Sequence, residues 1–260
     1  MDRKFLWLIL IVAVGSPAAL YLWREANRDQ PQSPPAPASI AEPPIRYPIE
    51  AVGSAAESLP PLGDSDGIVR RALAALFGPR LENLFISQDI VRRVVATVDN
   101  LPRDHVSSRL MPVKPAHGLL LTTQTERGLA LGPENAARYR PYVRLAQAVP
   151  TDKLVAAYTR FYPLLQQQYE GLGYPDGYFN DRVVQVIDHM LATPDVDGPL
   201  LLVQERVLYE FADPTLEELS AGQKILLRIG AENRVKIKAK LREIRQALTS
   251  QNAIEDFPAP

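Results

Sequence analysis

Carboxylates are the first side chains of this chain that could do chemistry, because paired carboxylates hydrolyse glycans and peptides by acid–base catalysis. Asp181 and Asp188 are candidates for that role, whereas the three histidines are scattered along the sequence. The motifs of serine hydrolases, phosphate-binding loops, dinucleotide-binding folds and zinc peptidases are absent. There is also no cysteine. We therefore expect no catalytic residues, no metal site and no cofactor, with a carboxylate-dependent hydrolase as the alternative.

Tyrosine is concentrated in one part of the chain, since seven of its ten tyrosines lie between residues 139 and 178. A tyrosine offers a flat apolar ring and a hydroxyl, which suits recognition of sugars or peptides. Tyr158, Tyr162 and Tyr169 share a predicted helix face with leucines, so their pattern favours packing. The first group of candidate binding residues lies outside that face and comprises Arg138, Tyr139, Arg140 and Tyr142.

The second group of candidates lies in a turn that leads into a helix, over residues 173–182. An Asn or Asp at the start of a helix caps its free amides, and an Arg can pair with a carboxylate. Folding alone would then account for these residues, but a turn so rich in aromatic and charged side chains can also line a pocket. Both interpretations stay open for Tyr174, Tyr178, Asn180, Asp181 and Arg182.

The last long helical segment is basic, with eight Lys or Arg and two Glu between residues 224 and 245. One predicted helical face carries Arg234, Lys238, Arg242 and Arg245. The apolar stripe predicted to oppose it carries Ile237, Leu241, Ile244 and Leu248. Such a face is either the solvated side of a packed helix or a surface for anionic lipid or polymer. The net charge of −1 gives no reason to expect nucleic-acid binding.

The elements that must position these residues are mainly helices. Asp66 can cap a helix that ends at Gly78, and Ser87 can cap a second helix that ends before Pro102. Two short apolar runs, residues 119–123 and 129–131, flank a turn and predict a β-hairpin.

The second half of the sequence predicts helices over residues 151–173, 179–191 and 231–248. Short apolar runs at 200–203 and 207–211 favour strands. Asp213 and Pro214 open one further helix, and Ser220 with Gln223 has the spacing of a capping box. The fold class is therefore mainly α with small β-hairpin elements, in one compact helical soluble domain over residues 62–249.

The N-terminal region has a different character. Residues 5–23 carry no charge, and as a helix they would extend roughly 28 Å, close to the thickness of a bilayer. We expect a single-pass transmembrane helix there, after a short cytoplasmic tail of residues 1–4. The alternative is a cleaved signal peptide with its cleavage site at Ser16-Pro17-Ala18.

Basic residues are nearly balanced on the two sides of this segment, with Arg3 and Lys4 before it and Arg24 and Arg28 after it. We expect an inner-membrane protein with a cytoplasmic N-terminus and a periplasmic domain. Nine prolines fall between residues 31 and 61, so residues 24–61 are predicted to be a Pro/Ala-rich disordered linker. Residues 250–260 are predicted to be a disordered tail.

Several separated motifs occur in a recognisable order. They are the octapeptide at residues 96–103, Arg-Tyr-Arg-Pro-Tyr-Val at 138–143, the stretch from 162 to 182, and the two short motifs between 211 and 224. In these motifs the chain resembles the bacterial proteins grouped as domain of unknown function 3014. The resemblance implies an envelope protein with an N-terminal anchor. It implies no activity, substrate or catalytic residue.

The function expected from these observations is that of a membrane-anchored envelope protein whose helical domain binds a partner. The partner would be an envelope protein or a cell-wall polymer, in addition to the inner membrane itself through residues 5–23. An envelope hydrolase that acts on glycan or peptide is the alternative. The sequence leaves the oligomeric state open.

Overall fold

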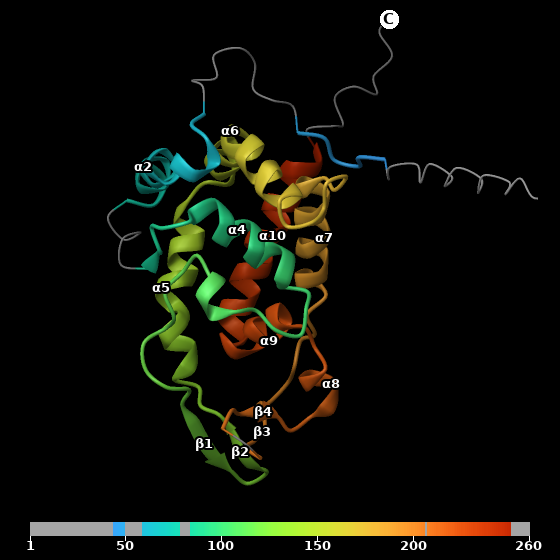
Figure 1. Ribbon diagram of the computed structural model, residues 1–260. Coiled ribbons are helices and arrows are strands. Elements are labelled where there is room, and N and C mark those ends of the chain that lie inside the picture. Colours follow the sequence, from blue (N-terminus) through green and yellow to red (C-terminus); the bar gives the residue numbers. More distant parts are fainter. Residues whose placement is uncertain (1–43, 50–58, 79–83, 206, 251–260) are drawn as a thin grey trace, which may run out of the picture. The chain divides into compact units, whose positions relative to one another are not determined.

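The computed structural model describes residues 44–49, 59–78, 84–205 and 207–250 (Figure 1). Contacts divide the chain into Met1–Pro44 and Ile45–Pro260, and the described helices and strands all belong to the second unit. The predicted cytoplasmic tail 1–4, the predicted transmembrane helix 5–23 and the tail beyond residue 250 lie outside the described residues. Within the described ranges, no helix combines the length and the apolar character needed to cross a membrane.

Helices make up more than half of the described residues of the second unit, which confirms the predicted mainly α class. The longer ones are α2 (Asp66–Phe77), α4 (Ile90–Asn100), α5 (Asn135–Ala148), α6 (Thr151–Glu170) and α7 (Phe179–Leu191). After two short strands come α8 (Pro214–Glu217), α9 (Ala221–Arg228) and α10 (Ala231–Ser250). Two 3-10 turns, η1 (Leu62–Asp64) and η2 (Ser108–Leu110), complete the helical part.

Two small antiparallel hairpins confirm the predicted β elements. Strand β1 (Thr122–Thr125) pairs with β2 (Gly128–Leu131), and β3 (Leu202–Val203) pairs with β4 (Glu210–Phe211). A bridge between Ala130 and Leu201 joins the hairpins. They lie together at the lower end of the view in Figure 1.

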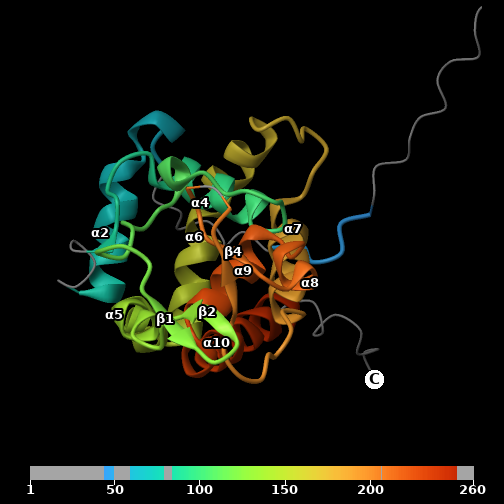
Figure 2. The ribbon, with the colours of Figure 1, turned by 90° about the horizontal axis from the view of Figure 1, so that it is seen from below.

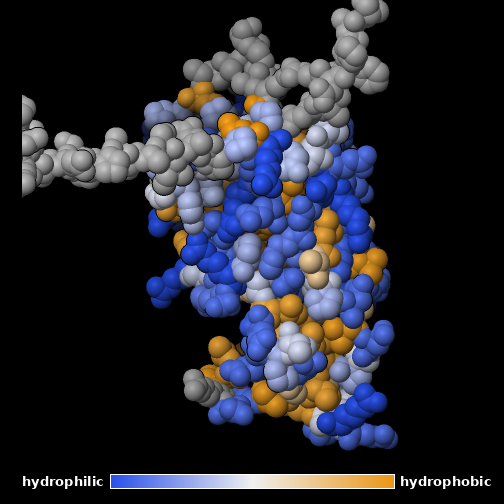
Figure 3. Space-filling view, turned by 90° about the vertical axis from the view of Figure 1, so that its right-hand side faces the viewer, coloured by the Kyte–Doolittle hydropathy of each residue, from blue (hydrophilic) through white to orange (hydrophobic). Residues whose placement is uncertain are grey.

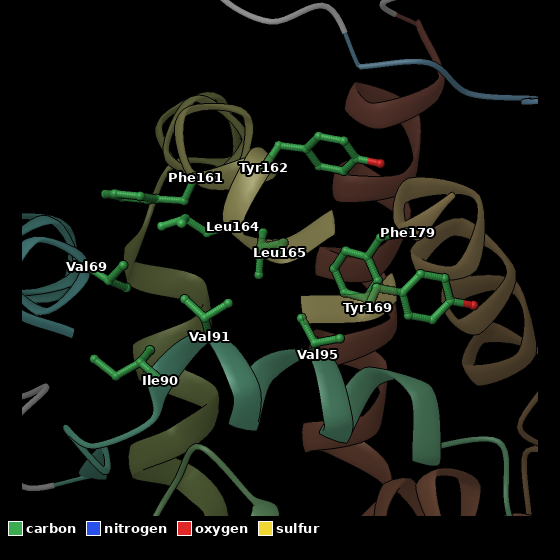
Figure 4. Packing of buried hydrophobic residues seen from close by; sticks show 10 residues of the cluster. All are labelled: Val69, Ile90, Val91, Val95, Phe161, Tyr162, Leu164, Leu165, Tyr169 and Phe179. Carbon is green, nitrogen blue, oxygen red and sulfur yellow. The ribbon is translucent and has the colours of Figure 1, made fainter. Parts of the chain in front are cut away.

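The core forms where α6 and α10 pack against the other long helices. Helix α10 contacts α5, α6 and α7, and α6 contacts α4 as well. Seen from below, α6 and α10 lie between α2 and α5 on one side and α7 and α8 on the other (Figure 2). The largest apolar cluster joins residues of α2, α4, α6 and α7 (Figure 4).

Aromatic rings fill much of this cluster, as the packing interpretation of the α6 tyrosines predicts. Tyr162 and Tyr169 are each 7 % exposed, and Tyr169 stacks on Tyr174 with ring centroids 4.7 Å apart. The Tyr158 hydroxyl donates a hydrogen bond to the Asn180 side chain, and the Tyr162 hydroxyl donates one to the Gln166 side chain. Burial raises the pKa of both phenols.

Hydrophobic side chains are unevenly distributed over the surface. The side of the molecule at α7 is mainly hydrophilic over its middle, and hydrophobic residues become more frequent toward the end that carries β3 and β4 (Figure 3). Val207 and Leu208, in the connection between these strands, are 87 % and 75 % exposed.

The caps predicted for the first two long helices are wrong. Asp66 is the first residue of α2, and its carboxylate accepts hydrogen bonds from the amides of Asp89 (2.7 Å) and Ile90 (2.8 Å). It therefore caps α4, where Ser87 was the predicted cap. The residue directly before α4 is Asp89, whose φ of 52° lies in the left-handed region. A tertiary contact here replaces the local cap that the sequence pattern indicates.

The two caps predicted near residues 213–223 are confirmed. The Asp213 side chain accepts a hydrogen bond from the amide of Thr215, and Pro214 occupies the first turn of α8. Ser220 and Gln223 form the complete capping box of α9. Both signals depend only on residues within one turn, so tertiary packing did not alter them.

Helix α5 is the main element that the sequence did not predict. Pro141 lies inside it, and a proline inside a helix removes one backbone hydrogen bond. Helix α5 nevertheless forms and carries the Arg-Tyr-Arg-Pro-Tyr-Val motif, which places that motif beside a large apolar cavity.

Candidate functional site

An apolar groove of about 520 Å³ lies between α5, α9 and the segment 106–116. We call it the α5–α9 groove. Two of the candidate tyrosines, Tyr139 and Tyr142, line it from α5. Facing them are aliphatic residues of α9 and α10, among them Ile225 and Ile237, and Met111 of the 106–116 segment. In Figure 1 this segment (bright green, with η2) passes between α5 and α9.

Arg138 also lines the groove, and its guanidinium fixes the loop that leads to β1. It donates to the carbonyl oxygens of His117 (2.9 Å) and Gly118 (2.6 Å), and to the Oδ1 of Asn135 (2.9 Å). All these acceptors are neutral, so they hold the guanidinium in place without cancelling its charge.

Asn135 completes this arrangement from inside the protein. It is 1 % exposed, and it exchanges hydrogen bonds with the backbone of Leu121 while its amide also donates to Gly132. Asn135 and Arg138 thus fasten the loop 116–121 to α5. The groove wall on this side is set by polar contacts, although the residues facing the cavity are mainly apolar.

Tyr142 is the tyrosine of the motif that reaches across the groove. Its hydroxyl donates to the carbonyl oxygen of Lys114 at 3.0 Å, which ties the 106–116 segment to α5. Burial is the main cause that raises the pKa of this phenol, and the neighbouring Tyr139 raises it further. The phenol is therefore neutral at physiological pH and acts as a hydrogen-bonding and stacking group, not as a base.

Arg228 lines the groove from α9. Its guanidinium lies 5.3 Å from the ring centroid of Phe211 and donates to the carbonyl oxygen of Tyr209 at 3.3 Å. Its Nε is buried and has no hydrogen-bond partner among the described residues. Most buried polar atoms in proteins have such a partner, so Arg228 retains capacity to bind an acceptor.

Part of the second candidate group, at the start of α7, binds a segment of the chain itself. The Asp181 carboxylate accepts from the amides of Arg46 (2.9 Å) and Tyr47 (2.8 Å). The Asn180 side chain donates to the Tyr47 carbonyl at 2.9 Å. We call residues 46–49 the strap.

The strap is held at its other end by Tyr178, whose hydroxyl accepts from the amide of Ile49. Ile49 and Tyr47 also pack against the apolar clusters of the core. The linker predicted over residues 24–61 therefore includes a stretch that is bound to the domain. Three of the candidate binding residues serve this internal contact.

Arg182 and Tyr174 belong to a different contact, which joins α7 to the end of α4. The Asp99 carboxylate, in a residue only 3 % exposed, pairs with the Nε of Arg182 at 3.0 Å and with Arg103 at 2.7 Å. The Tyr174 hydroxyl donates to the same carboxylate at 3.3 Å. The pairing with Asp99 raises the pKa of Arg103. This cluster explains Arg182 through ion pairing, as the structural interpretation of the turn predicts.

Both carboxylates considered for hydrolysis have partners within the fold. Asp181 binds the strap amides, and Asp188 pairs with Arg245 on the surface. Neither one lines the α5–α9 groove or the cavity of about 310 Å³ between α2 and residues 85–90. No group of three or more His, Cys, Asp or Glu within the described ranges could hold a metal ion.

The predicted basic face of α10 is not one exposed surface, which corrects the expectation for Arg234 and Lys238. They are 4 % and 7 % exposed, and the Lys238 ammonium donates to the carbonyl oxygen of Thr193. Arg245 forms an ion pair with Asp188. Arg242 remains exposed.

The reason lies in the angular spacing along α10. At about 100° per residue, the basic and apolar stripes are centred only about 85° apart, not on opposite sides. Arg234 lies within roughly 20° of Leu241 by the same spacing. Burying the apolar stripe therefore also buries the basic residues at its edge, where their long aliphatic stems can pack.

Sequence reasoning missed much of the groove. Arg140 belongs to the predicted motif but is exposed and is not among the residues that line the cavity. Met111, Ile225 and Arg228 line it without having been candidates. Apolar residues occur at positions 106, 110, 111 and 113 of this segment, but they do not say which helices the segment will face.

Comparison with known proteins gives a family. A family model described as "Protein of unknown function (DUF3014)" matches residues 90–245. The matched range contains the groove motif on α5, Asp99 and the turn before α7. No curated protein and no solved structure matches the chain.

Proposed function

Because the chain belongs to the DUF3014 family, whose description assigns no activity, we propose its function from the site: residues 45–250 form a protein-binding module. The α5–α9 groove receives an apolar segment of a partner protein. The observation that carries this proposal is the apolar lining of a cavity of about 520 Å³, with two tyrosines on one wall. Partner segments bind by placing a few apolar anchors in grooves of this kind.

A protein segment suits the groove better than the cell-wall polymer that the sequence left as a second possibility. A glycan needs several aligned hydrogen-bonding side chains, whereas this groove presents mostly aliphatic carbon. The Tyr142 hydroxyl and the donors of Arg138 are already used within the protein. An apolar partner side chain requires none of them.

An envelope hydrolase is the weaker candidate, because both carboxylates considered for it are engaged elsewhere in the fold. The location remains part of the proposal: a helix over residues 5–23 anchors the module in the inner membrane, and the module works on the periplasmic side. Its support is the uncharged stretch in the sequence. A C-terminal reporter enzyme active only outside the cytoplasm tests this placement, and activity of a cytoplasm-only reporter would refute it.

Photocrosslinking in intact bacterial cells tests the binding function. A benzophenone amino acid replaces Tyr142 or Met111 in the groove, and Val235, which is 61 % exposed on α10, serves as the matched control. The expected result is one protein captured from both groove positions and absent from the control position. Capture of the same set of proteins from all three positions would refute the proposal.

A further inference from the structure

The charged side chains that line the α5–α9 groove in the described part of the chain all have one sign. Its described lining includes Lys114, Arg138 and Arg228, and it includes neither Asp nor Glu. An apolar cavity bordered by cations in this way has a positive potential, which favours an occupant that carries carboxylates. The chain as a whole has a net charge of −1, so this potential is a local property of the groove.

Arg138 contributes a full charge, because its acceptors within the protein are neutral. Near Arg228 a carboxylate does exist, that of Glu217, but Lys224 binds it at 2.7 Å and the amide of Phe211 at 2.8 Å. Two cations therefore share one carboxylate on this side. Carboxylates of the protein thus neutralise only part of the positive charge on this side of the groove.

Arg228 also has an unused donor. Its Nε is buried without an acceptor in the described structure, next to an apolar surface. An acceptor brought by an occupant would remove the cost of that unsatisfied group once the side chain moves to present the atom.

On the basis of the proposed function, we propose that the partner segment is acidic as well as apolar. It is an amphipathic stretch with carboxylates beside its apolar anchors. The apolar side chains enter between Tyr142 and Ile225. The carboxylates lie at the rim toward Arg228 and Arg138. Electrostatic attraction then determines which apolar segments bind, and the aliphatic floor supplies most of the affinity.

The preference for acidic segments is tested by selecting peptides from a random display library on the full-length, detergent-solubilised protein. Counter-selection uses Ile225→Gln, with Met111→Gln as a second groove variant in case the first does not fold. Peptides that bind in a groove-dependent way should contain more Asp and Glu than the unselected library. Enrichment of neutral or basic peptides, or of none, would overturn the inference.

Charge variants then test the selected peptides. Arg228→Gln should weaken binding of a selected peptide by about fivefold, and binding should weaken as salt is raised. Arg242→Gln, which removes an exposed charge outside the groove, should leave the affinity unchanged. Equal effects of the two changes would overturn the inference.

Two further measurements distinguish other occupants of the groove. Groove-dependent binding to vesicles of anionic phospholipid in place of peptide would identify a lipid ligand and overturn the inference. Concentration-dependent dimerisation abolished by Ile225→Gln would identify a second copy of the chain, with the same consequence. Groove-dependent binding of neutral peptides would overturn only the charge preference, whereas loss of all groove-dependent binding would also refute the proposed function.

Discussion

At the scale of single residues, carboxylates of the same type have very different roles according to what surrounds them. Asp66 caps a helix other than its own, Asp181 binds the strap, and Asp99 is buried between two arginines. Asp188, on the same helix as Asp181, forms a surface ion pair. The contribution of each carboxylate to stability depends on these contacts.

Asp181→Asn tests the strap contact. The neutral amide keeps the shape but replaces one acceptor of the two backbone amides by a donor, so we expect a loss of about 1–3 kcal/mol in the free energy of unfolding. Urea denaturation measures it, and hydrogen exchange at the Tyr47 amide should become faster. The control is Asp188→Asn on the same helix, whose ion pair is solvent-exposed and should cost less than about 1 kcal/mol. Equal losses for the two variants would contradict this role of Asp181.

Asp99→Asn tests the buried ion cluster. Removing this charge leaves the Arg182 guanidinium without its carboxylate, and we expect a loss of about 3–5 kcal/mol in urea denaturation. Arg103→Gln is the matched comparison, because the Arg103 side chain is 53 % exposed and water can solvate the remaining carboxylate. It should cost about 1 kcal/mol or less. If Arg103→Gln were the more damaging variant, Arg103 would be the more important partner of Asp99.

At the scale of elements, close helix contacts depend on a small residue at one position of α9. Gly222 lies where α9 meets α7 and the end of α4, and a Cβ there would come within 2.6 Å of the Met190 sulfur and 2.9 Å of the Leu101 carbonyl oxygen. In α2, a Cβ on Gly67 would meet only the Arg71 guanidinium, at 3.8 Å. Close packing thus requires a glycine at position 222, whereas a Cβ at position 67 would have space.

Gly222→Ala and Gly67→Ala should therefore change stability in opposite directions. Overpacking against the Leu101 backbone should cost about 1–3 kcal/mol, whereas alanine at Gly67 should stabilise by roughly 0.5–1 kcal/mol through a less flexible unfolded chain. Thermal and urea unfolding of both variants measure the difference. A stabilising Gly222→Ala would show that α9 can shift away from α4 at little cost.

At the scale of the whole molecule, stability should depend on pH through His189. Its Nε2 lies 2.8 Å from the Ser220 hydroxyl, and burial, together with the charge of Arg182, lowers the pKa of the imidazole below its ordinary value of 6.5. Between the folded and the unfolded pKa the unfolded chain binds more protons. This contribution is therefore fully present above about pH 6.5 and is lost as the pH falls toward the folded pKa.

His189→Gln should remove that part of the pH dependence. The free energy of unfolding of the wild type should fall between about pH 7 and pH 5, and the variant should show a flatter profile over this range. The Glu217 carboxyl, whose pKa is also lowered, titrates below its ordinary 4.5 and so acts at more acidic pH. His105→Gln changes an exposed histidine and serves as the control. Parallel profiles for wild type and His189→Gln would refute the assignment.

Local signals were enough to predict many elements of this protein. The capping box of Ser220 and Gln223, the Asp213-Pro214 start of α8 and the β1–β2 hairpin each depend on residues within a few positions of one another. The apolar periodicity of α6 also predicted correctly that Tyr162 and Tyr169 pack in the core. The capping and hairpin contacts join neighbouring residues, so here they form without help from a distant partner.

Only the tertiary structure decided which residues form the site. The groove joins α5, α9 and residues 106–116, and the strap joins residues 46–49 to a turn more than 120 positions later. The Asp66 side chain caps α4 although Asp66 is the first residue of α2, and Arg234 is buried with the apolar stripe beside it. Such contacts depend on which faces pack together, a choice made by the summed burial of many apolar side chains. By itself, the sequence determined most of the helices, the hairpins and the family; packing determined the groove and the residues that line it.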